Sequence, residues 1–313
     1  MPGNGIFPGR LTLPVISAPM FRVSGPDLVI AACRAGVIGA FPCANCRSPQ
    51  ELDEWLTRIA SALTPADAPL CPNLIIRHGA LAEQLAVLLR HRVEMVITSV
   101  GSPAAVIEPL HSVGCKVFAD VASLRHAHKA LDAGVDGLVL LSAGAGGQTG
   151  WVNGFAFVRA VRAFYDGPLV LAGGMTDGHS LWAARVLGCD LAYMGTRFIA
   201  THESMAEPAY KQMLVQSELD DVMLSDAFTG LPANMLRPSI LAAGLDPQAL
   251  PAELQQEGVA NLFASNGHKL RRWKDIWSAG HSVSGVRSVC STTELVEELC
   301  RDYLAARASS CAT

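Results

Sequence analysis

The sequence predicts an α/β protein built on a (β/α)8 or TIM barrel, followed by a mostly helical C-terminal segment. A short aliphatic run followed by a helix-length amphipathic stretch recurs eight times within about 200 residues. The aliphatic runs are almost continuously hydrophobic, which is typical of parallel strands covered on both faces. The glycine-rich turns follow the sixth and seventh runs, whereas a doubly wound nucleotide-binding sheet usually carries them after its first strand. These observations favour the barrel over the doubly wound sheet.

The strands and helices are expected in strict alternation. The helical stretches carry apolar residues at i, i+3 and i+4, and several end in glycine, a frequent stop signal for helices. The expected strands are residues 14–20, 37–42, 71–76, 94–100, 116–121, 137–143, 168–174 and 191–198. The expected helices are residues 27–36, 49–63, 80–92, 103–114, 123–134, 155–167, 178–188 and 206–217.

The alternation ends after residue 217. Residues 218–313 are too numerous for a tail and too apolar to be disordered. We therefore predict a barrel domain over 1–217 and a mostly helical lid or substrate segment over 218–313. The last part, about 271–313 with a helix at 292–306, is expected to dock back on the barrel.

Composition excludes several classes of protein. Half of the 313 residues are hydrophobic, 17% are charged, and the net charge of −4 argues against a nucleic-acid partner. No apolar run approaches the roughly 20 residues needed to cross a bilayer, and the N-terminus lacks the apolar core of a secretory signal. A cytoplasmic protein without a membrane partner is expected. The nine cysteines are scattered, and only Cys43 and Cys46 have a C-x-x-C spacing, so no metal site is predicted.

Glycines mark an anion site at the end of the barrel that bears the loops after the strands. The seventh strand ends in AGGMTDG, the eighth in MGTRF, and the sixth leads into AGAGGQTGW. Gly173, Gly174, Gly195 and Thr196 can therefore bring backbone N–H groups against a phosphate. A single Gly-Gly pair could instead reflect tight packing, but such turns after consecutive strands indicate phosphate binding.

Several motifs in the same order resemble the nitronate monooxygenase, or 2-nitropropane dioxygenase, family of FMN-dependent barrels, which is related to enoyl-ACP reductase II. They are APM at 18–20, PNL at 72–74, AGAGGQTG, AGG at 172–174, MGTRFIATHES, TGLPANMLRPSI and KDIWSAG. The resemblance implies bound FMN, no metal, and a small-molecule substrate, with O2 or NAD(P)H as the second reactant. By position it implies that Ala18, Met20, Asn73, Gly146, Gly147, Gly173, Gly174, Gly195 and Thr196 bind the cofactor.

Gln148 departs from this family at the position that the resemblance links most directly to the reaction, because many members have AGGH where this chain has AGGQ. That histidine is taken to remove a proton from the substrate carbon or to donate to it. An amide exchanges hydrogen bonds but cannot hold a transferred proton near pH 7. Neutral nitroalkanes should therefore be poor substrates, whereas an anionic nitronate needs only a donor to its oxygens. Hydride transfer from a nicotinamide also needs no base.

Other residues are candidates for the chemistry that Gln148 cannot perform. His281 is the first histidine to consider as a replacement base, although an exposed structural histidine is an alternative. Asp120 ends the fifth strand, a catalytic type of position in a barrel, but it could also cap the next helix in competition with Ser123. Trp151 and Phe228 are predicted to contact the substrate, with core packing as the alternative for lid aromatics such as Trp273 and Trp277.

Three functions follow from these residues. The first is an FMN-dependent oxidoreductase that oxidises nitronates with O2. The second is an NAD(P)H-dependent FMN reductase of a quinone, an enone or an enoyl thioester. The third is a flavin-binding protein without turnover. The sequence leaves the physiological substrate, the nicotinamide preference and the oligomeric state open, and an oligomer is compatible with it.

Overall fold

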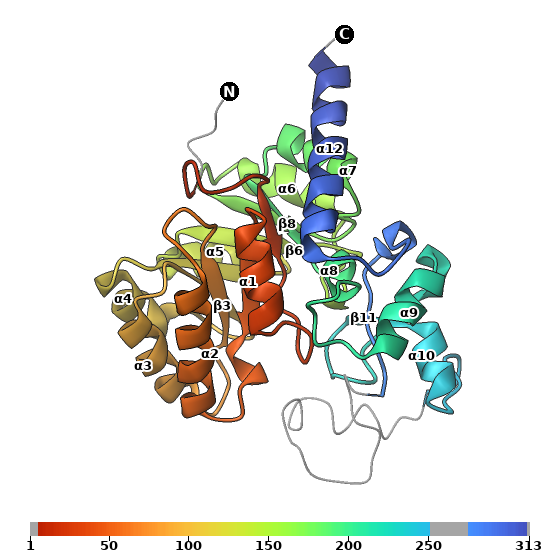
Figure 1. The fold of residues 1–313 in the computed structure, drawn as a ribbon, viewed down its shortest axis with the longest axis horizontal. Coiled ribbons are helices and arrows are strands. Elements are labelled where there is room, and N and C mark those ends of the chain that lie inside the picture. Colours follow the sequence, from red (N-terminus) through yellow and green to blue (C-terminus); the bar gives the residue numbers. More distant parts are fainter. Residues whose placement is uncertain (1–5, 251–274, 312–313) are drawn as a thin grey trace.

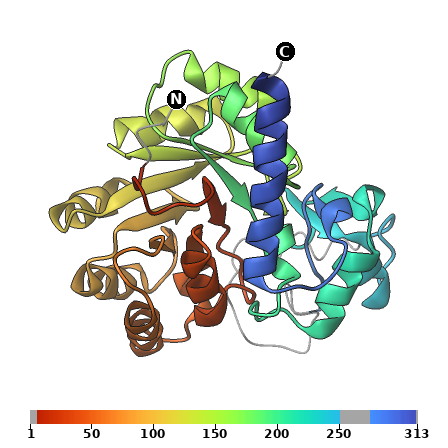
Figure 2. The same ribbon diagram turned by 45° about the horizontal axis from the view of Figure 1, so that its top comes forward.

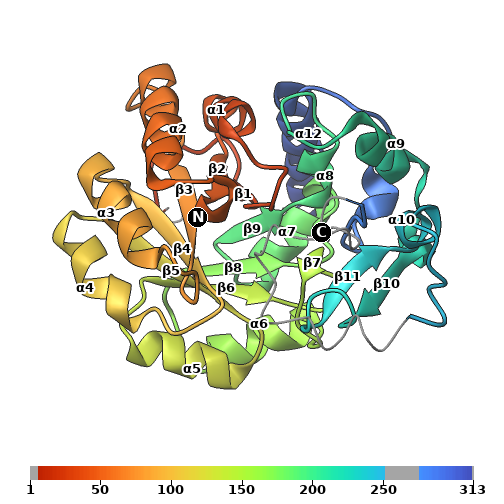
Figure 3. The ribbon, with the colours of Figure 1, turned by 90° about the horizontal axis from the view of Figure 1, so that it is seen from below.

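The computed structural model describes residues 6–250 and 275–311, and it confirms the predicted barrel. Eight parallel strands form a closed ring, in which β9 pairs with β1. Figure 3 shows the strands at the centre and helices α1 to α5 arranged around one side of them. The barrel strands are β1 (Val15–Ser17), β2 (Ile38–Pro42), β3 (Leu70–Ile75), β4 (Met95–Ser99), β5 (Lys116–Val121), β6 (Gly137–Leu141), β8 (Leu169–Ala172) and β9 (Leu191–Met194).

Several barrel helices begin where a polar side chain caps the first turn. The side chains of Ser48, Ser123 and Asp177 each accept a hydrogen bond from the backbone N–H three residues on, at 3.2, 3.2 and 2.8 Å. The bounds are α1 (Pro26–Arg34), α2 (Pro49–Ala62), α3 (Leu81–His91), α4 (Ala104–Ser112), α5 (Leu124–Asp132), α6 (Gly154–Arg162) and α7 (Gly178–Leu187). No helix within the described ranges is long and apolar enough to cross a membrane.

The strands are hydrophobic throughout because both of their faces are buried. Along β6, Leu138 and Leu140 belong to the core between the strands and the helices, whereas Val139 belongs to a second core inside the barrel. Successive side chains of a strand point to opposite faces, so each strand supplies both cores. Burying a side chain of this size stabilises the fold by roughly 1.5–3 kcal/mol.

The segment after the barrel contains a small sheet that the sequence did not indicate. Strand β10 (Val222–Ser225) pairs with β11 (Ala233–Leu236), and β11 pairs with β7 (Gly147–Gln148) in the glycine-rich loop of the barrel. Helices α9 (Pro208–Gln216) and α10 (Arg237–Ala242) lie beside this sheet, on the right of Figure 3. The lid is therefore tied by backbone pairing to the loop that bears Gln148.

The C-terminal helix α12 (Thr292–Cys311) lies against the outside of the barrel. It packs beside α7 and α1, as Figures 1 and 2 show from two directions. Leu295, Val296 and Leu299 are buried in the core between strands and helices. The division of the chain at residue 217 remains a prediction, and residues 271–274 and Trp273 lie outside the described residues.

The last barrel strand is shorter than the predicted 191–198. It stops at Met194, and Thr196 begins the short helix α8 (Thr196–Ile199). The reason is that β1 offers pairing only as far as Ser17, which lies opposite Met194. The turn at Gly195 and Thr196 consequently faces the open end of the barrel.

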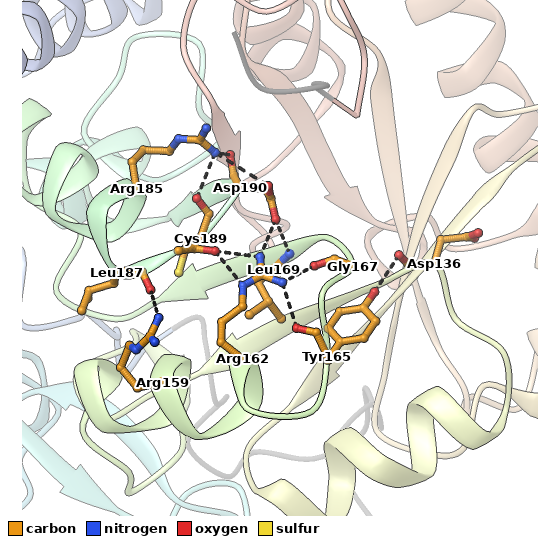
Figure 4. Close-up of polar contacts among 11 residues, drawn as sticks. Asp136, Arg159, Arg162, Tyr165, Gly167, Leu169, Arg185, Leu187, Cys189 and Asp190 are labelled. Atoms are coloured by element: carbon orange, nitrogen blue, oxygen red, sulfur yellow. Dashed lines mark hydrogen bonds and ion pairs between the residues drawn. The ribbon is translucent and has the colours of Figure 1, made fainter. Parts of the chain in front are cut away.

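The opposite end of the barrel is held by Arg162 at the end of α6 (Figure 4). Its Nε and Nη2 atoms donate to the Gly188 carbonyl at 2.8 and 2.7 Å, and Nη2 also donates to Asp190 Oδ2 at 2.8 Å. The same Asp190 oxygen accepts from the backbone N–H of Leu169 at 2.9 Å. One partly buried guanidinium thus joins α6 and the end of α7 to the starts of β8 and β9, leaving the other end of the barrel for the site.

Candidate active site

A cavity of about 230 Å³ opens at the carboxyl ends of the barrel strands, where barrel enzymes bind their ligands. Tyr210 of α9 and Trp277 of the returning segment form part of its wall, with their rings stacked at 5.0 Å. Most of the predicted site residues meet in this cavity. They are Ala18, Met20, Asn73, Asp120, Gly146, Gly147, Gln148, Gly173, Gly174, Gly195 and Thr196.

The floor of the cavity is the last layer of side chains that point into the barrel. Phe118 lies in the inner core, so Asp120, two residues further along β5, is the next inward residue. Asn73 and Ser99 reach the floor by the same alternation from β3 and β4. Asn73 Nδ2 donates to Ser99 Oγ at 3.2 Å and to the Ile97 carbonyl at 3.1 Å, which fixes its amide.

Asp120 is the floor residue without such a partner. Its Oδ1 atom is buried and makes no hydrogen bond in the described structure. Burial raises the pKa of Asp120 to about 7 from an ordinary value of 3.8. The alternative role as a helix cap is wrong, because Ser123 caps α5. Asp120 is therefore a carboxyl group that faces the cavity and titrates near neutrality.

Glycines form the wall where β8 and β9 end. Gly173 and Gly174 have φ values of +111° and +71°, which L side chains rarely adopt. A Cβ atom on Gly173 would lie 2.5 Å from Ser142 Oγ, whereas one on Gly174 would meet nothing within 4 Å. Among the described residues, no carbonyl accepts from the backbone N–H groups of Gly174, Gly195 or Thr196. This wall therefore offers free donors beside open space, as an anionic group requires.

The lid holds the glycine-rich loop against this wall. Gln148 on β7 lies opposite Ala233 of β11, and the buried amide of Asn234 donates to the Ala145 carbonyl at 2.7 Å. A Cβ atom on Gly146 would lie 2.7 Å from the backbone nitrogen of Gly280, so the returning segment touches the loop directly. These contacts keep Gln148 at the cavity.

Sequence reasoning missed the side chains that hold the loop after β1. Asn45 Nδ2 donates to the carbonyls of Met20 and Ser24 at 3.1 and 2.8 Å, and its Oδ1 accepts from Arg22 N–H at 2.8 Å. Arg22 is kept at a φ of +61°, which is uncommon for a residue with a side chain. The sequence signal was an asparagine directly after a barrel strand, in the position where loops carry site residues.

Three predicted residues lie outside the cavity. His281 is exposed, its backbone N–H donates to the Gly144 carbonyl at 2.9 Å, and its imidazole lies against Gly144, whereas Ser282 faces the cavity. Trp151 is 82% exposed, since the chain leaves the cavity there to begin α6. Phe228 is 1% exposed because it forms the core of the lid with Met235, Ile240 and Ile276. Their roles as a replacement base and as substrate contacts stay predictions.

Comparison with known proteins places this arrangement in a family. The family model for nitronate monooxygenase matches residues 66–302, which is more than half of the chain. The chain belongs to the nitronate monooxygenase family. The resemblance seen in its motifs is thereby confirmed, and the protein is an oxidoreductase of a family of FMN-dependent enzymes.

Relatives of this nitronate monooxygenase family member differ in their named reactions. A nitronate monooxygenase of Paraburkholderia phytofirmans is 28% identical over 280 residues, covering 75% of this chain and 76% of its own. The (3aS,4S,5R,7aS)-5-hydroxy-7a-methyl-1-oxo-octahydro-1H-indene-4-carboxyl-CoA dehydrogenase of Mycobacterium tuberculosis is 27% identical over 251 residues, covering 78% and 70%. The solved structure of FabK from Thermotoga maritima shares the fold, with a TM-score of 0.81, 24% identity and 96% coverage of both chains.

Proposed function

We propose that the cavity binds FMN. The glycine wall fits the phosphate, because the N–H groups of Gly174, Gly195 and Thr196 have no carbonyl acceptor among the described residues and line the cavity, with open space beside Gly174. The floor fits a flat polar ring, because Asn73 is held by Ser99 and Asp120 has a buried oxygen without a partner. The rest of the cofactor would contact cavity residues Ala18, Met20, Gly146, Gly147 and Gly173. When bound, FMN supplies a group that accepts and returns two electrons.

The function that this site supports best is the oxidation of nitronates with O2, with FMN as the cofactor. The observation that carries it is Gln148, which β11 holds at the cavity where many relatives have histidine. A nitronate has already lost its carbon proton, so it needs a hydrogen-bond donor to its oxygens rather than a base. The Gln148 amide supplies that donor. Within residues 218–313, the returning segment that lines the cavity and the strand β11 that holds the Gln148 loop would act as the lid that keeps water from the cavity of the barrel domain, residues 1–217.

Oxygen consumption with propionate-3-nitronate tests this function. Turnover well above that of free FMN is expected, whereas a neutral nitroalkane should react slowly. Gln148→His should raise the rate with the neutral nitroalkane more than the rate with the nitronate, because it adds a proton acceptor. A nitronate rate no higher than that of free FMN would refute the proposal, and equal gains on both substrates would refute the role of Gln148.

A second candidate is the NAD(P)H-dependent reduction of an enone or enoyl thioester. It is favoured by the relative from Mycobacterium tuberculosis, whose name describes a dehydrogenase of a carboxyl-CoA compound. Reduction of this kind does not need the missing histidine. Anaerobic mixing with NADH and with NADPH should bleach the visible absorption of bound FMN if this candidate is correct. Absence of bleaching with both nucleotides excludes it, and bound FMN that no donor reduces indicates binding without turnover.

A further inference from the structure

The floor of the cavity contains the carboxyl group of Asp120, whose buried Oδ1 atom makes no hydrogen bond in the described structure. Asp120 lines the cavity from β5, next to the strand that supplies Ser99. Asn73 and Ser99 bond to each other on the same floor, whereas Oδ1 of Asp120 is buried without a partner. A buried carboxyl oxygen without a partner is costly, so its presence at the cavity calls for a role with the ligand.

Among the described residues, no positively charged group shifts the pKa of Asp120, since burial is the cause of its shift. The titratable side chains that face it are Tyr193 from β9 and Cys71 from β3. Burial raises the pKa values of both the Tyr193 hydroxyl and the Cys71 thiol well above their ordinary values, so both are neutral near pH 7. The adjoining strands present Ser99 and Leu141, which do not titrate. The proton on Asp120 is therefore controlled by burial and by any charge that enters the cavity.

We propose that Asp120 takes up a proton when FMN bound in this cavity is reduced, so that this side chain links the cofactor's potential to pH. Reduction by two electrons with uptake of one proton would add one negative charge to FMN bound here. A negative charge nearby favours the neutral form of a carboxyl group, so a second proton from solvent binds to the Asp120 carboxylate. In turnover the electrons come from the substrate or the nicotinamide named above. The inference rests on the proposed binding of FMN.

The second proton changes how the potential varies with pH. For a two-electron couple, each proton taken up contributes about 30 mV per pH unit. If FMN and Asp120 each take up one proton, the potential therefore falls by about 60 mV per pH unit. This slope applies above the pH at which Asp120 ionises beside oxidised FMN. In Asp120→Asn this contribution is lost, and the slope in the same pH range should fall by about half.

Redox titration of the purified holoenzyme with dithionite and reference dyes, from pH 6 to pH 9, measures these slopes. Asp132→Asn is the matched control, because it removes an exposed carboxylate from α5 in the same strand-helix unit. The control should keep the wild-type slope. Equal slopes for wild-type enzyme and Asp120→Asn overturn the inference.

An infrared difference spectrum provides a second readout that does not depend on the variant. At pH 8, the reduced-minus-oxidised spectrum of the wild-type holoenzyme should show the C=O band of a newly protonated carboxyl group, which shifts in D2O. Absence of this band overturns the inference. A preparation that neither contains nor takes up FMN would instead refute the proposed function, so the two failures are distinguishable.

Discussion

Replacing Asp120 by asparagine should stabilise the cofactor-free protein, and increasingly so as the pH rises. Burial raises the pKa of Asp120 from 3.8 to about 7, a difference of about three units. Each unit corresponds to 1.36 kcal/mol, so the buried carboxylate costs up to about 4 kcal/mol of folding free energy. Asparagine has a similar shape and never carries this charge.

The sign of the pH dependence follows from proton binding. Between about pH 4 and pH 7 the folded chain keeps the Asp120 proton, whereas the unfolded chain has released it. The wild-type protein therefore loses stability as the pH rises through this window, and the loss is complete above about pH 7. Asp120→Asn should exceed the wild type by only about 1 kcal/mol near pH 4.5 and by up to about 4 kcal/mol at pH 8.

Urea unfolding of FMN-free wild-type protein and of the variant, at several pH values, measures this difference. Other titrating groups cancel because they are common to both proteins. Asp132→Asn, with its exposed side chain, should show no comparable gain at any pH. A difference between Asp120→Asn and wild type that does not change with pH would show that this carboxyl has an ordinary pKa, and the reasoning would fail.

Three further predictions, which use four variants, test the rest of the structure. Gly174→Ala and Gly244→Ala both place a Cβ atom in open space at φ values of +71° and +77°, so each should cost roughly 1–2 kcal/mol in unfolding free energy. Only Gly174→Ala should also weaken FMN binding, by tenfold or more in a fluorescence titration, and equal FMN affinities would contradict the phosphate wall. Arg162→Met should lower the unfolding free energy by about 1–3 kcal/mol, because it removes the Arg162 donor from Asp190 and from the Gly188 carbonyl; a loss below 1 kcal/mol would contradict this. Asn234→Ala should cost about 1–3 kcal/mol and speed proteolysis of the loop at 144–150, since the buried Ala145 carbonyl loses its partner; unchanged cleavage would show that the lid does not hold the loop.

Local sequence patterns were sufficient to predict the barrel and to place the residues at the ends of its strands. Alternation along β3 and β5 directs Asn73 and Asp120 inward, and closure of the ring then brings them to one floor. The glycine turns after β8 and β9 meet there for the same reason, because all parallel strands end at one side of the barrel. In such a case, position within a strand determines position in the site.

Residues on long connections could not be placed in this way. His281, Trp151 and Phe228 lie where contacts distant in sequence direct the chain, such as the bond from His281 N–H to Gly144 and the packing of Phe228 on Ile276. The pairing of β11 with β7 joins residues more than 80 positions apart, and neither segment has the long alternating pattern of a strand.

The sequence by itself determined the barrel and the end of it that carries the site, because periodicity and strand ends are local properties of the chain, and the family resemblance pointed to Gln148 as the departure from histidine. Only the tertiary structure decided that Asp120 has no partner while Asn73 has one. Whether a buried polar atom is paired depends on the side chains that neighbouring strands place beside it, and that register exists only once the ring has closed.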